Sequence, residues 1–82
     1  MGKWKTLEEI DIADTNRTLL LQYTEEDGGR ERVYAVLFSV EKENYSMTEN
    51  RQERWGDNAR ERSYKEFNDR LEKLGIDKRV ES

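Results

Sequence analysis

The stretch that decides the fold runs from residue 17 to residue 40 and reads RTLLLQYTEEDGGRERVYAVLFSV. Its two apolar segments, residues 17–23 and 32–40, are rich in the Leu, β-branched and aromatic side chains typical of strands. Between them lie Asp27, Gly28 and Gly29, which suit a two-residue hairpin turn because glycine accepts positive φ. The sequence therefore predicts a β-hairpin.

The turn leaves two registers open for this hairpin. If residues 27–28 form the turn, Leu21 faces Tyr34; if residues 28–29 form it, Tyr23 faces Tyr34 and Glu25 faces Arg32. The second register is favoured because cross-strand aromatic and opposite-charge pairs stabilise a sheet. Both registers assemble the same apolar face, namely Leu19, Leu21, Tyr23, Tyr34, Val36, Phe38 and Val40.

Upstream of the hairpin, residues 4–12 predict a third strand. Ile10 and Ile12 alternate with Asp11, which is the period of a half-buried strand. Residues 14–16 are a turn signal that separates this strand from the hairpin. One helical turn at residues 7–9 is the alternative for part of the segment.

Downstream, residues 57–74 predict an amphipathic helix. Tyr64, Phe67, Leu71 and Leu74 recur at helical spacing along one stripe. Asp57 suits the N-cap, and Gly75 suits the position after the last turn, with Ile76 placed for the hydrophobic contact that often follows. A capping-box pattern at residues 46–49 further predicts a shorter helix that breaks near Gly56.

These elements predict an α+β fold. It consists of a three-stranded antiparallel sheet, a meander with a central hairpin, packed against one C-terminal amphipathic helix. The chain has 82 residues, so we expect a single domain over residues 1–76 and a frayed tail over residues 77–82.

The composition excludes most catalytic chemistry. The chain has no Cys and no His, which removes thiol nucleophiles, Cys-based metal sites, the Ser-His-Asp triad and the commonest general base near neutral pH. Glu41 and Glu43 share one strand face but are interpreted as a solvated strand end. We therefore expect no enzyme activity, no cofactor and no metal site.

From the hydropathy pattern we expect neither a membrane span nor a secretory signal. No apolar run approaches the ~20 residues that cross a bilayer, and mean hydropathy is −1.21. The absence of Cys also suits a reducing compartment. We therefore expect a cytoplasmic protein that does not associate with membranes.

The charge balance favours a role in binding another protein. Acidic side chains number 19 and basic ones 15, and residues 1–50 hold eleven of the acidic and six of the basic ones. We expect a non-catalytic interaction module for a partner with a basic surface, resembling in class the small inhibitors that present carboxylates where DNA phosphates would sit. The residues expected to bind the partner are Glu25, Glu26, Asp27, Glu41, Glu43 and Trp55.

A second hairpin face and two tryptophans add to this expectation. The second face carries Leu20, Val33, Ala35 and Leu37, which together are too apolar to face water alone. A partner or a homodimer mate would cover them. Trp4 and Trp55 lie outside the apolar stripes and either close the ends of the core or anchor an interface.

Nucleic-acid binding is the alternative function. Arg51, Arg54, Arg60 and Arg62 flank Trp55, and arginine beside an aromatic ring can contact phosphate and stack on bases. Acidic residues interrupt this segment, whereas a phosphate-binding surface is usually an unbroken basic face. Nucleic acid is therefore the less favoured partner.

Overall fold

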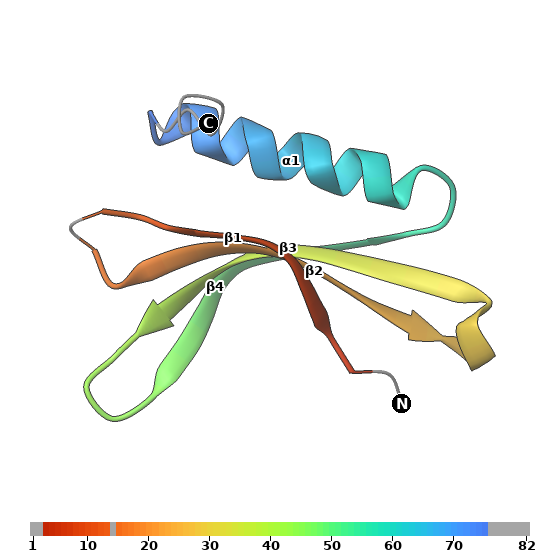
Figure 1. Cartoon of the computed structure of the whole chain (residues 1–82), viewed down its shortest axis with the longest axis horizontal. Coiled ribbons are helices and arrows are strands. Elements are labelled where there is room, and N and C mark those ends of the chain that lie inside the picture. The colour runs from red at the N-terminus through yellow and green to blue at the C-terminus, as the bar shows by residue number, and fades with distance from the viewer. Residues whose placement is uncertain (1–2, 14, 76–82) are drawn as a thin grey trace.

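The computed structural model of the chain describes residues 3–13 and 15–75 (Figure 1). Its elements are β1 (Lys5–Asp11), β2 (Arg17–Glu26), a short 3-10 turn η1 (Asp27–Gly29), β3 (Glu31–Glu41), β4 (Ser46–Trp55) and α1 (Ala59–Lys73). The strands form one antiparallel sheet in the order β1-β2-β3-β4, and α1 crosses one face of it. The α+β class with a C-terminal helix is confirmed, but the sheet has four strands rather than three. Ile76 and the tail at residues 77–82 lie outside the described residues.

The central hairpin adopts the second of the two predicted registers. Tyr23 pairs with Tyr34 and Glu25 with Arg32. The rings of the two tyrosines stack with their centroids 5.7 Å apart. Gly28 has a φ of 66° and Gly29 a φ of 88°, which is the positive φ that a type I′ turn requires at both central residues.

Residues 46–55 form the fourth strand, so the short helix predicted from the capping box is wrong. The reason lies in β3, where every residue from 33 to 38 is buried. A strand buried on both faces needs hydrogen-bond partners along both of its edges. β2 supplies one edge, and β4 supplies the other, although β4 itself is polar and mostly exposed.

The first strand, β1, carries an irregularity close to its start. The register shifts between Thr6 and Glu8, which is the signature of a β-bulge, so the alternative of a helical turn at residues 7–9 is wrong. Leu7 packs against the core from this bulge. Figure 1 shows the first part of β1 descending on the side of the sheet away from α1.

The helix begins at Ala59, slightly later than predicted. Asn58, rather than Asp57, is the N-cap; its φ is 63°, and its side chain makes no capping hydrogen bond. At the other end Gly75 has a φ of 76° and its N–H donates to the carbonyl oxygen of Glu72 at 3.0 Å. The predicted role of Gly75 after the last turn is therefore confirmed.

The buried stripe of α1 differs in part from the predicted one. It consists of Ala59, Ser63, Phe67 and Leu71, whereas Tyr64 is only half-buried and Leu74 is 40% exposed. Residues four apart stay nearly in line on a helix, so the sheet meets a narrower strip than the apolar residues alone suggest. The core joins these residues to Leu19, Leu21, Tyr34, Val36 and Phe38 of the sheet.

Candidate binding surface

The sheet has a second face that α1 does not cover, which we call the open face. Residues directly opposite each other in an antiparallel pair share a face, so the register assigns every strand residue to one side. Leu20 lies on the open face, because Leu19 and Leu21 on either side of it pack in the core under α1. The register then extends this assignment across all four strands.

The open face is acidic. Its exposed carboxylates are those of Glu9, Asp11, Glu26, Glu31, Glu41 and Glu53. Arg51 is one of the two bulge residues of β4 between Glu49 and Gln52, and it is the one arginine among the described strand residues of this face. The opposite side of the sheet carries four cations, Lys5, Arg17, Arg32 and Arg54, and three carboxylates, Glu8, Glu25 and Glu49. The register therefore concentrates negative charge on the open face and leaves the α1 side nearly balanced, in a chain whose overall net charge is −4.

Among the residues that the structure describes, only Glu53 of these six carboxylates forms an ion pair. Arg51 forms an ion pair with Glu53, with its Nε 2.8 Å from the Glu53 Oε2. Glu26 and Glu31 face each other across the hairpin, and like charges directly opposite are destabilising in a sheet. The open face thus holds an excess of negative charge that a cationic partner would neutralise.

Apolar side chains form the floor of this face. Ala35 is fully buried and Leu37 is 2% exposed, although no helix or strand among the described residues covers this side (Figure 1). The guanidinium carbon of Arg51 lies 4.7 Å from the ring centroid of Trp4. Since Trp4 precedes β1 and Arg51 belongs to β4, their contact crosses the face over β2 and β3, and we expect it to shield part of the floor from water.

Trp55 is the other tryptophan of the open face. It ends β4 opposite Val33 and is 58% exposed. Trp4, at 37% exposed, contributes both to the floor and to the surface. Tryptophan and arginine are among the residue types enriched at the energetic hot spots of protein interfaces.

The predicted partner-binding residues fall into separate places. Glu26, Glu41 and Trp55 lie on the open face. Glu25 lies on the side of α1, where its Oε2 is 3.6 Å from the Arg32 Nε. Asp27 lies in the hairpin turn η1, and Glu43 lies in the loop between β3 and β4, at the opposite end of the sheet, so the five acidic residues do not form one surface.

The four arginines of the alternative prediction are also dispersed. Arg51 lies on the open face, whereas Arg54 points to the other side and forms an ion pair with Glu66 of α1. Arg60 and Arg62 are exposed on the first turns of α1. The structure therefore brings no unbroken stripe of these four side chains together.

The sequence prediction omitted Glu9, Asp11, Glu31 and Glu53 from the candidate residues. The hairpin register would have placed Glu31 beside Glu26 on one face. The predicted strand at residues 4–12 would likewise have placed Asp11 on the side of the sheet opposite Ile10 and Ile12. No sequence pattern indicated the face on which Glu53 lies, because that face is defined only once residues 46–55 are known to form a strand.

Among residues 3–13 and 15–75, no three carboxylates come together in a way that would hold a metal ion. Within the same ranges, α1 is too short and too polar to span a bilayer. Comparison of the chain with known protein families, curated proteins and solved structures finds no match.

Proposed function

We propose that this protein is a non-catalytic interaction module whose open face binds a basic surface of a partner protein. The observation that carries the proposal is the register, which gathers on one face six carboxylates and a single arginine among the described strand residues. Complementary charge of this kind steers association and selects partners. Trp55 supplies the exposed aromatic anchor on the same face.

The dimensions of the open face suit a small protein interface. Four strands about 4.8 Å apart and about ten residues long present on the order of 600 Å². A standard interface buries about 800 Å² on each partner. Side chains at the rim of the sheet would provide the remaining area.

The charge of the open face argues against its pairing with a second copy of itself. An isologous dimer places identical patches against each other, so six carboxylates would meet six. A homodimer through this face is therefore disfavoured, and the proposed occupant is a different protein. Proteins that bind nucleic-acid phosphates carry basic surfaces, so an inhibitor that mimics those phosphates is the more specific form of the proposal.

Nucleic-acid binding keeps one observation in its favour. The groove between α1 and β4 is lined by Arg54, Arg62, Lys65, Arg70 and Lys73 against Glu66 and Asp69. Glu66 already neutralises part of this charge through Arg54 and Arg70. An oligonucleotide titration tests this candidate, because phosphate contacts weaken steeply as salt rises from about 50 to about 200 mM.

The main experiment compares two charge-reversed variants in a lysate pull-down. One variant changes Glu9, Glu31 and Glu41 of the open face to Lys. The matched control changes Glu43, Asp57 and Glu72, which are exposed outside that face, to Lys. Both variants carry the same net charge, and circular dichroism checks that both are folded.

If the proposal is right, the pull-down should contain proteins that bind to the wild type and to the control variant but not to the open-face variant. Purified candidates should then compete with duplex DNA for the module if the phosphate-mimicking form is right. Equal retention by all three proteins would contradict the open-face proposal. Trp55→Ala tests the anchor separately, because that exposed side chain contributes little to folding.

A further inference from the structure

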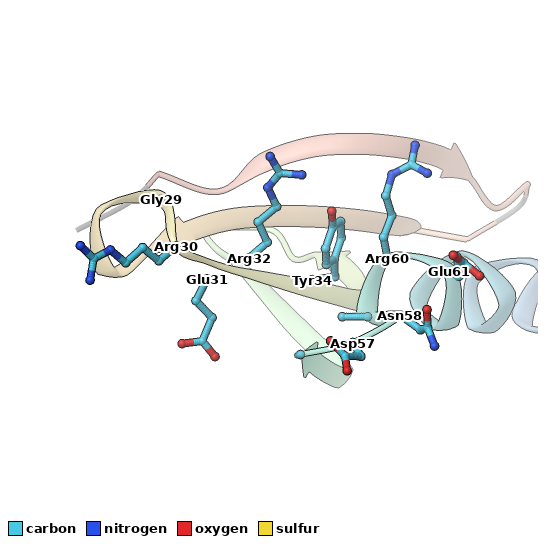
Figure 2. A pocket seen from close by; sticks show the side chains of 11 residues that line it. Gly29, Arg30, Glu31, Arg32, Tyr34, Asp57, Asn58, Arg60 and Glu61 are labelled. Atoms are coloured by element: carbon cyan, nitrogen blue, oxygen red, sulfur yellow. The ribbon is translucent and has the colours of Figure 1, made fainter.

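A second cluster of polar side chains lies on the other side of the sheet, beyond the N-terminal end of α1 (Figure 2). It lines an open groove of about 610 Å³ between the start of β3 and the first turn of the helix. This size falls within the range of small-molecule sites. The residues that matter here are Arg32, Tyr34, Asn58, Arg60 and Glu61.

Tyr34 places an unused hydrogen-bonding group in this groove. The residue is 5% exposed, and its ring is held by stacking on Tyr23. Its hydroxyl takes part in none of the side-chain hydrogen bonds among the described residues. Figure 2 shows that hydroxyl pointing out of the sheet between the side chains of Arg32 and Arg60.

The two arginines extend on the same side as this hydroxyl (Figure 2). The guanidinium of Arg60 lies over the ring of Tyr64, 5.0 Å from its centroid, which limits its motion. The carboxylates of Glu31 and Asp57 extend on the opposite side of the ribbon. The side of the groove that holds the hydroxyl therefore carries two guanidinium groups, with the carboxylate of Glu25 beside Arg32 and that of Glu61 on the first turn of α1 as its acidic neighbours.

The first turn of α1 adds backbone donors. Asn58 does not cap the helix with its side chain, and the N–H of Ala59 donates to the carbonyl oxygen of Gly56 at 3.3 Å. The next two N–H groups, of Arg60 and Glu61, have no acceptor within the helix. Such donors and the helix dipole favour an anion at this end.

We propose that this groove binds a phosphate group, held between Arg32 and Arg60 and accepting a hydrogen bond from the Tyr34 hydroxyl. A tetrahedral dianion offers enough oxygens for two guanidinium groups and one hydroxyl at once. Glu25 competes for this place, because its carboxylate lies 3.6 Å from Arg32. Binding of the phosphate displaces that loose, exposed ion pair. The site is independent of the open face.

The experiment titrates the 15N-labelled full chain with inorganic phosphate at constant ionic strength and follows the backbone amides. Saturable shifts are expected at Arg60, Glu61 and the residues around Tyr34. Tyr34→Phe should weaken binding about tenfold, because it removes one hydrogen bond to a charged group. Arg60→Ala should weaken it further, whereas Glu25→Gln should tighten it by removing the competing carboxylate.

The controls separate this site from general charge effects. Arg62→Ala removes a nearby exposed arginine that lines a different groove, and Tyr45→Phe removes a hydroxyl from an exposed tyrosine; neither should change the affinity. Parallel titrations with O-phosphoserine distinguish a phosphate monoester from free phosphate as the preferred source. Non-saturable shifts for both ligands, or an unchanged affinity in Tyr34→Phe, would overturn the proposal.

Discussion

Arg51 and Trp4 belong to opposite edges of a four-stranded sheet, yet the guanidinium carbon lies 4.7 Å from the indole centroid. The contact is possible because β1 bends at its bulge, so that the first residues of β1 turn toward the side of the sheet away from α1. We expect the contact to help bury Ala35 and Leu37, over which the described residues form no second layer of secondary structure. The sheet therefore has a packed core on one side and a thin cover of side chains on the other.

The first prediction concerns this cover. Trp4→Ala should lower the free energy of unfolding by about 2 kcal/mol and Arg51→Ala by about 1 kcal/mol, because each exposes apolar floor. The double variant should show a coupling of about 0.5–1 kcal/mol, typical of a partly exposed cation–π pair. Urea unfolding measures all three variants. Glu53→Gln controls for loss of the Arg51–Glu53 ion pair, and strictly additive effects would contradict a direct contact.

The second prediction concerns Ser63, which is fully buried against the sheet. Its Oγ has no hydrogen-bond partner among the described residues, and an unpaired buried hydroxyl costs about 1–3 kcal/mol. Ser63→Ala should therefore stabilise the protein by about 1 kcal/mol or more in thermal or urea unfolding. Asn68→Ala, at an exposed position of α1, measures the gain from helix propensity alone. A loss of stability in Ser63→Ala would show that the hydroxyl is hydrogen-bonded.

The third prediction concerns Glu66, whose carboxylate lies between the guanidinium groups of Arg54 and Arg70. These side chains are only 15–25% exposed, so removal of the carboxylate leaves two cations poorly solvated. Glu66→Gln should lower the free energy of unfolding by about 2 kcal/mol. Asp69→Asn breaks the exposed ion pair with Lys65 and should cost less than about 0.5 kcal/mol. Equal effects would mean that the Glu66 cluster is solvated like a surface pair.

The fourth prediction concerns the turn at Gly28 and Gly29. Space does not limit substitution, since a Cβ at Gly28 would meet nothing within 4 Å, so the backbone conformation decides the outcome. Asn tolerates the left-handed region, and Gly28→Asn should leave the melting temperature nearly unchanged. Gly29→Ala should cost about 1 kcal/mol, because its φ is 88°. If Gly29→Ala were neutral, the turn would not be type I′.

Local patterns in the sequence were sufficient for the hairpin and the helix. The glycine pair, together with the charge pair of Glu25 and Arg32, favours the register that the two strands adopt. Helical spacing identifies Phe67 and Leu71 as buried. The same kind of pattern failed at residues 46–49, where a capping box lies in a strand, because local propensity is weaker than the need of a buried neighbouring strand for hydrogen bonds.

The candidate surface was only partly accessible to sequence reasoning. Charge alone points to Glu26 and Glu41, and the register places both on the open face. Charge points equally to Glu25, which lies on the other side because successive strand residues alternate between faces. Charge alone therefore could not decide which acidic residues share a surface.

By itself the sequence determined the two elements whose patterns lie within a short stretch of the chain, namely a hairpin with a glycine turn and an amphipathic helix. Only the tertiary structure decided that residues 46–55 extend along β3, that the strand carboxylates divide between two faces, and that Tyr34 meets the end of α1 between two arginines. The physical reason is that turn geometry and helical period act between near neighbours in the chain. Strand pairing and helix–sheet packing instead bring together residues that are far apart in the chain. The hydrogen bonds and burial that stabilise them therefore cannot be predicted from any short stretch of sequence.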